Sequence, residues 1–214
     1  MRLNVLLAIL AVSTGLILDG VCPAAAQFYL QHNLVSDGAV PADITDARVV
    51  NAWGLVSGPT TPWWFSDNGT GLATLYNVGT ATIVNTFTVP GSGGQQGTPT
   101  GVVFNGGTGF VVNNGAGSSP ARFIFASEGG TISAFRAAPI VTVVPNNGSG
   151  AVYKGIAIDS TTAGTLLYAT NFHAGTVDVF NSTFTSRCPA GSPIPIFLLD
   201  TPRSGSRISV APST

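Results

Sequence analysis

The sequence predicts an all-β protein built from three similar units of about four short strands. Three stretches share one order: an apolar strand, a turn rich in Gly or Asn, and an alternating strand that ends in an aromatic residue. They are WWFSDNGTGLATLYN at 63–77, RFIFASEGGTISAFR at 122–136 and LLYATNFHAGTVDVFN at 166–181. Alternation with a period of two predicts a β-hairpin in each stretch. The glycines Gly71, Gly130 and Gly175 occupy the same place in the three turns.

Flanking segments complete each predicted unit. A short strand that opens on Gly54, Gly101 or Gly155 precedes each hairpin, and a further strand follows the first two, in TIVNTFTVP and PIVTVVPN. Four short strands in a period of about 40–50 residues are typical of a β-propeller blade. A β-sandwich is the alternative, but it gives no reason for so long a period. We therefore expect an all-β, propeller-like fold with about three four-stranded blades and an incomplete ring.

Composition narrows the classes of function. The chain has 214 residues, of which 44% are hydrophobic and 8% are charged, and its net charge is -1. This length suits one domain with a sizeable core. Because the chain lacks a basic surface that could hold phosphate groups, we expect no nucleic-acid partner.

The N-terminus predicts export. Arg2 precedes an apolar run, and Ala24–Ala26 stand before Gln27, as in a secretory signal peptide spanning 1–26. The run is too short for a membrane span, so we expect none in the mature chain. The protein would be extracellular, periplasmic or at the cell surface. Cys22 would leave with the peptide, and Cys188 alone could not form an internal disulfide.

Several phrases, among them NLVSDGAVPADITDARVVNAWGL and GAVYKGIAI together with the three hairpins, resemble a family of uncharacterised exported bacterial proteins. Members are predicted to form β-propellers in the style of NHL repeats. The resemblance covers roughly 33–184 and implies a fold and export, but no reaction. Family members continue into further blades, whereas the pattern here stops after Phe184. We interpret the chain as a C-terminally truncated or frame-shifted member, with a natural disordered tail as the alternative.

This interpretation predicts domain bounds. The signal peptide would span 1–26 and the partial propeller 27–184, with blades at roughly 40–95, 96–148 and 149–184. The rest, 185–214, would be an irregular and disordered tail. Three blades do not close a ring, since propellers typically have 4–8.

Catalytic and metal motifs are absent from the sequence. There is no nucleophile elbow, phosphate-binding loop or dinucleotide fingerprint. His32 and His173 lie far apart, and the Asn-Gly turns lack the spaced carboxylates of a calcium loop. We therefore predict no catalytic residue, no metal site and no cofactor.

The blade topology nevertheless predicts a ligand-binding face. Turns between second and third strands share one face with the loops that enter the next blade, and loops on a rigid scaffold carry function. This face would gather Asp67, Asn68, Lys154, Asn171 and His173, together with Glu128. Trp53, Thr100 and Lys154 directly precede the opening glycines and would lie near the central axis. The alternative for each is a structural role: turn residues for Asp67, Asn68, Asn171 and His173, a solvated Glu128, core packing for Trp53, and a paired Lys154.

Two classes of function remain. The first is a non-catalytic binding or scaffold module for a protein, a glycan, a surface component or another small polar ligand. The alternative is an extracytoplasmic propeller enzyme, a hydrolase or lyase with a central metal. The small number of carboxylates and histidines favours the first.

The aromatic cluster at 63–65 is a separate candidate. Alternation sends Trp63 and Phe65 to one face of their strand and Trp64 to the other. Core packing is the main interpretation of these residues, and stacking on a sugar ring is the alternative.

Overall fold

The computed structural model describes residues 30–187 except 116, 147, 162 and 163. The predicted signal peptide, both cysteines and the predicted tail from residue 188 lie outside the described residues. All the sheets belong to a compact unit that begins at Asn33. Apart from one short 3-10 turn, η1 (Ser92–Gly94), every regular element described is a β-strand.

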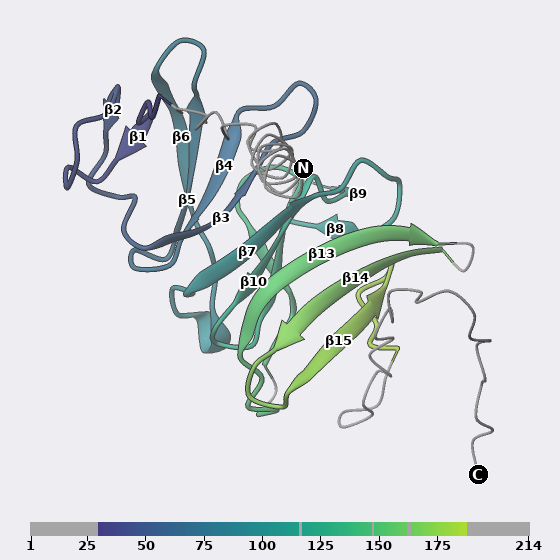
Figure 1. The fold of residues 1–214 in the computed structure, drawn as a ribbon. Coiled ribbons are helices and arrows are strands. Elements are labelled where there is room, and N and C mark those ends of the chain that lie inside the picture. Colours follow the sequence, from purple (N-terminus) through teal and green to yellow (C-terminus); the bar gives the residue numbers. More distant parts are fainter. Residues whose placement is uncertain (1–29, 116, 147, 162–163, 188–214) are drawn as a thin grey trace, which may run out of the picture. The chain divides into compact units, whose positions relative to one another are not determined.

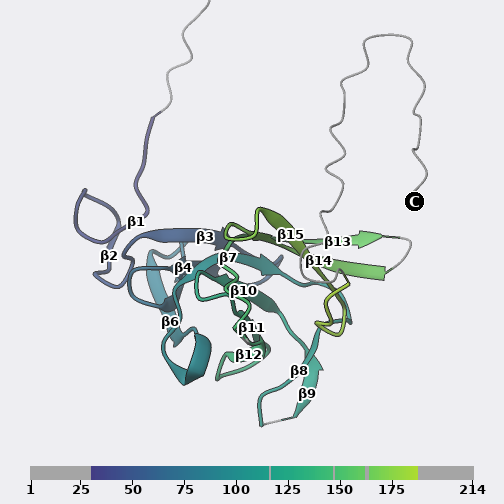
Figure 2. The ribbon, with the colours of Figure 1, turned by 90° about the horizontal axis from the view of Figure 1, so that it is seen from below.

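Three antiparallel sheets form the described fold, and in each sheet strands that are consecutive in a unit are neighbours. The first sheet contains β3 (Ala52–Val56), β4 (Trp63–Asp67), β5 (Leu72–Asn77) and β6 (Thr82–Thr88). The second contains β7 (Pro99–Phe104), β10 (Phe123–Ser127), β11 (Ile132–Phe135) and β12 (Val141–Val144). The third contains β13 (Tyr153–Thr161), β14 (Gly164–Asn171) and β15 (Thr176–Asn181). Figure 2 shows the second sheet running from β7 to β12.

Smaller elements lie beside these sheets. The strands β1 (Val35–Ser36) and β2 (Ile44–Thr45) pair in parallel before the first sheet. A hairpin of β8 (Val111–Asn113) and β9 (Ser118–Pro120), which the sequence pattern did not predict, separates β7 from β10. Beyond β15, the backbone N–H of Arg187 donates a hydrogen bond to the carbonyl of Val179 at 2.8 Å. Residues 185–187 therefore line the outer edge of the third sheet.

The three predicted hairpin turns have the same backbone conformation. Gly71, Gly130 and Gly175 have φ angles of 65°, 71° and 66°. Side chains other than Gly are disfavoured there, because a Cβ crowds the backbone at positive φ. The predicted equivalence of these glycines is confirmed, and it places the three turns at corresponding ends of their sheets.

The first strands of consecutive sheets meet in backbone contact. Figure 1 shows β7 between β3 and β13, and both pairs of strands contact each other. A Cβ added to Gly54 would lie 2.7 Å from the carbonyl oxygen of Thr100, and one added to Gly101 would lie 2.8 Å from the backbone nitrogen of Ile156. Only Gly permits so close an approach. The opening glycines are therefore the points at which one sheet packs on the next.

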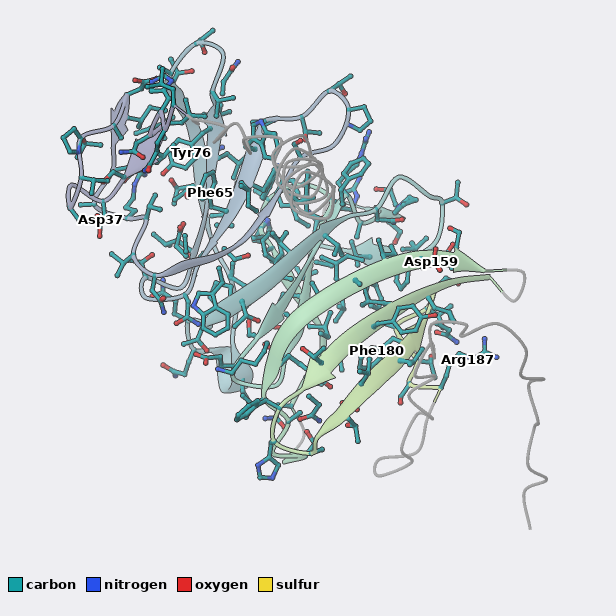
Figure 3. The ribbon with its side chains drawn as sticks, in the orientation of Figure 1. Asp37, Phe65, Tyr76, Asp159, Phe180 and Arg187 are labelled. Atoms are coloured by element: carbon teal, nitrogen blue, oxygen red, sulfur yellow. The ribbon has the colours of Figure 1, made fainter. Side chains whose placement is uncertain are left out.

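Apolar side chains fill the space between the sheets. Trp64 is 2% exposed and its ring stacks on Phe123 of the second sheet, with 4.3 Å between ring centroids. A second cluster joins the second and third sheets through buried residues that include Ile124, Leu167 and Phe180, the last labelled in Figure 3. Trp63 lies on the opposite face of β4, as the alternation predicts, but it is 38% exposed, so the expected core packing of this residue is wrong.

The predicted all-β class and the antiparallel sheets are confirmed. The sheets described here do not close into a ring, and the propeller arrangement stays a prediction. In the part of the chain that the structure describes, no helix has the length and apolar character needed to cross a membrane.

Candidate ligand-binding site

Polar side chains from three consecutive sheets meet in one hydrogen-bonded chain. Asn68, in the turn between β4 and β5, donates from Nδ2 to Oε2 of Glu128 at 3.0 Å. Glu128 follows β10, and its Oε1 forms an ion pair with Nζ of Lys154 on β13. Asn51 extends the chain by donating from Nδ2 to Oδ1 of Asn68 at 3.1 Å.

Two aromatic rings flank the ammonium group of Lys154. Nζ lies 4.8 Å from the ring centroid of Trp53, on the first strand of the first sheet, and 6.0 Å from that of Phe172, in the turn between β14 and β15. Ammonium groups at such distances are attracted to the negative face of an aromatic ring. The rings come from the first and third sheets, while Glu128 comes from the second.

Backbone irregularities aim these side chains. The pairing of β3 with β4 shifts register between Ala52 and Gly54, and that of β13 with β14 shifts between Tyr153 and Ile156. Such bulges bend the strand and re-aim a side chain. Trp53 and Lys154 are the residues at the two shifts, and both reach the same place. Their predicted proximity is confirmed.

The cluster is accessible and carries no net charge. Trp53 is 46% exposed and Phe172 is 76% exposed, while the side chains of Lys154 and Glu128 are each 30% exposed. The hydrogen bond from Lys154, followed by that from Asn68, lowers the pKa of Glu128 below its ordinary value. One carboxylate therefore neutralises one ammonium between two exposed aromatic surfaces.

Asp67 does not belong to this cluster. Its side chain is fully buried and accepts a 2.7 Å hydrogen bond at Oδ2 from the hydroxyl of Thr74. Within the described residues Oδ1 has no hydrogen-bond partner. Burial raises the pKa of Asp67 to about 6. The predicted place of Asp67 on the ligand face is wrong, because the end of β4 turns this side chain toward the scaffold.

A second polar cluster attaches the segment before β3 to the first sheet. Tyr76, labelled in Figure 3, donates from its hydroxyl to Oδ2 of Asp46 at 2.7 Å. Arg48 donates to both carboxylate oxygens, from Nε to Oδ1 at 2.8 Å and from Nη2 to Oδ2 at 2.7 Å. The hydrogen bonds from Arg48 hold the pKa of Asp46 down at about 2. This network is structural, since Tyr76 is fully buried and Asp46 is 6% exposed.

Asn171 and His173 have different roles in the third sheet. Asn171 is buried, donates from Nδ2 to Oδ2 of Asp178 at 3.0 Å, and accepts from the backbone of Val152 at 3.3 Å. It therefore holds the end of β14, which is the structural role given above as the alternative for this residue. His173 is exposed, next to Phe172 in the same turn, and its ring lies beside Gly150.

Of the five predicted site residues, the structure brings Asn68 and Lys154 together and leaves His173 in the neighbouring turn. Three other residues belong to the cluster. Trp53 and Glu128 were placed on this face with core packing and solvation as their alternatives, and Phe172 was not considered. A signal for Phe172 exists, because a large apolar side chain in a polar hairpin turn has no sheet face to cover it. No three His, Cys, Asp or Glu side chains gather into a metal site in the described ranges.

The known proteins found to be similar to this chain are distant relatives. No family model matches the chain. "Uncharacterized protein L690" of Acanthamoeba polyphaga mimivirus is 29% identical over 159 residues, which cover 71% of this chain and 41% of that protein. "Uncharacterized protein R648" of the same virus is 27% identical over 158 residues, which cover 71% of this chain and 38% of that protein. The chain spans about two fifths of the length of these curated relatives.

These findings correct the expected family. The resemblance to exported bacterial proteins with NHL-like propeller repeats is wrong, because the relatives found are viral and no repeat family matches. The interpretation of the chain as a truncated or frame-shifted member of that family is therefore wrong as well. Most of the phrases that suggested the family lie in the strands of the three sheets, and they reflect a repeated architecture.

Proposed function

We propose that the chain is a non-catalytic binding module that recognises a neutral carbohydrate, with its three sheets arranged as consecutive blades of a propeller. The carbohydrate site consists of Trp53, Phe172, Lys154, Glu128 and Asn68. The observation that carries the proposal is the meeting of two exposed aromatic rings around a polar chain drawn from three sheets.

The blade arrangement rests on the repeated packing of first strands. Gly54 contacts the first strand of the second sheet, and Gly101 contacts the first strand of the third in the same way. In a propeller the first strands surround a central axis, and each sheet packs its face on the next. Bulges before the opening glycines then direct Trp53 and Lys154 to one end of that axis.

The chemistry of the site suits a sugar ring. A pyranose presents a flat face of C–H groups, which packs on an aromatic ring, and a rim of hydroxyl groups, which donate and accept hydrogen bonds. Trp53 and Phe172 supply the aromatic surfaces. Lys154 supplies donors, Glu128 supplies acceptors and the amide of Asn68 supplies both. Ligand sites commonly combine apolar walls with a few placed polar groups in this way.

Charge favours a neutral ligand over an anionic one. The ammonium of Lys154 is already paired with Glu128. An anion would have to displace that carboxylate and leave it partly desolvated, which is unfavourable. Hydroxyl groups can join the existing pair without breaking it, because each charged group retains further hydrogen-bonding capacity.

A glycan array probed with the purified protein tests the proposal, followed by calorimetric titration of the glycans that bind. Trp53→Ala and Phe172→Ala should each weaken binding about tenfold or more. Trp63→Ala is the matched control, because Trp63 is also partly exposed but lies outside the site. Equal affinity for all four proteins would refute the site, and an array without any bound glycan would refute the ligand class.

We also propose that the module acts outside the cytoplasm, on the strength of Arg2, the apolar run and Ala24–Ala26 alone. Expression in a secretion-competent host should release protein that begins at Gln27. N-terminal sequencing that finds Met1 on the released protein would contradict cleavage.

A further inference from the structure

Three tripeptides in the chain match Asn-X-Ser/Thr, the acceptor pattern for N-linked glycans in exported proteins. They are NGT at 68–70, NGS at 147–149 and NST at 181–183. Asn147 lies outside the described residues, so the structure permits a comparison of the first match with the last. Because so short a pattern also occurs by chance, the local structure has to decide which of the two can carry a glycan.

The side-chain amide of Asn181 is fixed through its oxygen and leaves its nitrogen free. Oδ1 accepts hydrogen bonds from the hydroxyl of Thr183 at 2.7 Å, from the backbone N–H of Thr183 at 3.0 Å and from that of Thr185 at 2.9 Å. In the described part of the chain Nδ2 has no hydrogen-bond partner, and it is not buried. The reacting atom of the pattern is therefore open to solvent.

Asn68 has the same pattern in a different setting. Its Nδ2 already donates to Glu128 inside the candidate carbohydrate site. The hydroxyl of Thr70 donates to the carbonyl of Arg48 at 2.7 Å, and not to the amide of its own tripeptide. A glycan on Asn68 would also have to fit among the aromatic rings and the ion pair of the site. The fold therefore favours Asn181 as the acceptor.

The end of β15 offers room for a glycan away from the candidate carbohydrate site. The strand starts just after the turn that carries Phe172 and ends at Asn181. It has 6 residues, and at about 3.3 Å a residue it places the acceptor roughly 17 Å farther along the sheet. Thr183 and Thr185, which follow, are exposed. A glycan at this end leaves Phe172 and Trp53 accessible.

We propose that Asn181 is an N-glycosylation site, modified when the chain enters the secretory pathway of a glycosylating cell. The donor is an oligosaccharide linked to a lipid pyrophosphate. Nδ2 of Asn181 forms a bond to C1 of the first sugar while the bond from C1 to the pyrophosphate oxygen breaks. Nδ2 gives up one proton to a base of the cell's transferase, and the lipid pyrophosphate leaves. The proposal rests on the export proposed above and does not depend on carbohydrate binding.

The turn after Asn181 suits this chemistry. An amide nitrogen is a poor nucleophile, because its lone pair is delocalised into the carbonyl group. When Nδ2 loses its proton, negative charge develops on Oδ1, and the three donors from Thr183 and Thr185 point at that atom. Donors aimed at developing charge stabilise it. All of them lie within four residues of Asn181, so the arrangement is local and can form before the sheets assemble.

Secretion of the full chain from a cultured eukaryotic cell line tests the proposal. A glycan-releasing amidase used in heavy-oxygen water converts each glycosylated Asn into an Asp that carries the isotope, and peptide mass spectrometry reads each position separately. We expect the label at Asn181 in most molecules and no label at Asn68. The intact mass of the secreted protein should fall when the glycans are released.

Variants at Thr183 separate the acceptor pattern from folding. Thr183→Val keeps the shape of the side chain and removes the hydroxyl, so the label at Asn181 should be lost. Thr183→Ser keeps a hydroxyl and should retain the label. Thr185→Val is the matched control, because it removes a hydroxyl from an exposed neighbour outside the tripeptide, and it should also retain the label. Thermal melts of the three secreted variants should agree after deglycosylation.

Failure of export and failure of modification are distinguishable. The chain is produced with its own N-terminus and, separately, with residues 1–26 replaced by the leader of a secreted protein. Release of the second form alone would contradict export, and the state of Asn181 would still be read on that form. Secreted protein with an unlabelled Asn181 would overturn the proposal. A label at Asn68 in place of Asn181 would overturn the comparison of the two turns.

Discussion

The ammonium group of Lys154 lies 4.8 Å from the ring centroid of Trp53, although the two residues belong to the first strands of the third and first sheets. The second sheet lies between these strands in the sequence and supplies Glu128, the carboxylate that pairs with Lys154. The contact is possible because bulges in β3 and β13 direct both side chains to the same side. The candidate site is therefore a product of the way consecutive sheets pack.

The ion pair in the site should contribute to binding more than to folding. Replacing Lys154 by Met keeps an aliphatic stem and removes the charge. Because the pair is partly exposed, we expect the free energy of unfolding to change by less than about 1 kcal/mol, while glycan affinity falls. Urea denaturation and calorimetric titration measure the two effects. Arg122→Met, at an exposed residue outside the site, is the control and should alter neither.

The opening glycines should differ in their tolerance of a methyl group. Gly101→Ala places a Cβ within 2.8 Å of the Ile156 backbone, and we expect it to lower the free energy of unfolding by about 2 kcal/mol or more through overpacking. Gly155→Ala meets only the side chain of Thr170, so its effect on the free energy of unfolding should stay below about 1 kcal/mol. Equal destabilisation by the two variants would contradict the packing of first strands described here.

The two neighbouring tryptophans of β4 should also differ. Trp64 is fully packed between the first and second sheets, and we expect Trp64→Ala to destabilise the fold by about 4 kcal/mol. Trp63→Ala removes a partly exposed ring, so the monomer should lose less than about 1 kcal/mol. Chemical denaturation at low protein concentration measures both. Similar losses in the two variants would show that the alternation along β4 has been assigned to the wrong faces.

Asp67 should give the stability an unusual dependence on pH. Its pKa is raised to about 6 by burial, so the folded protein retains a proton that the unfolded chain releases near pH 4. Stability contributed by this group therefore falls as the pH rises from about 4 to about 6, by up to about 3 kcal/mol, and stays low above that range. Asp46 acts in the opposite sense and at lower pH. Its pKa in the folded protein is lowered to about 2, so the stability it contributes is present above the pKa of the unfolded chain and is lost as the pH falls toward 2.

Asp67→Asn separates these effects. The amide cannot ionise and its oxygen can still accept from Thr74. The melting temperature of the wild type should fall between pH 4 and 6, and that of the variant should not. If wild type and variant follow parallel curves through this range, the buried carboxylate does not titrate as described.

Most of the sheet structure was predictable because it depends on local patterns. The alternation around Trp64, the turn glycine Gly130 and the opening glycine Gly101 each mark a strand or turn without reference to the rest of the chain. The β8–β9 hairpin escaped prediction because Val111–Asn113 and Ser118–Pro120 are too short to show a period. Whether such sheets close into a ring is not predictable from the repeat, since closure depends on the angle between sheets.

The site was predictable only in part. Topology placed Asn68 and Lys154 on one face, and both lie there. The burial of Asp67 and Asn171 depends on which way a strand end turns, and a pattern with a period of two does not determine this at a bulge or a turn. The exposure of Trp53 was not predicted for the same reason, because the bulge before Gly54 takes this residue out of the alternation.

The most direct test of the account is an NMR titration that follows the indole N–H signals of the three tryptophans, assigned with single variants, while the glycan that binds is added. The account predicts a saturable shift of the Trp53 signal, with the buried Trp64 signal unchanged and the same midpoint as calorimetry gives. A Trp53 signal that does not move while calorimetry reports binding would contradict the proposed site.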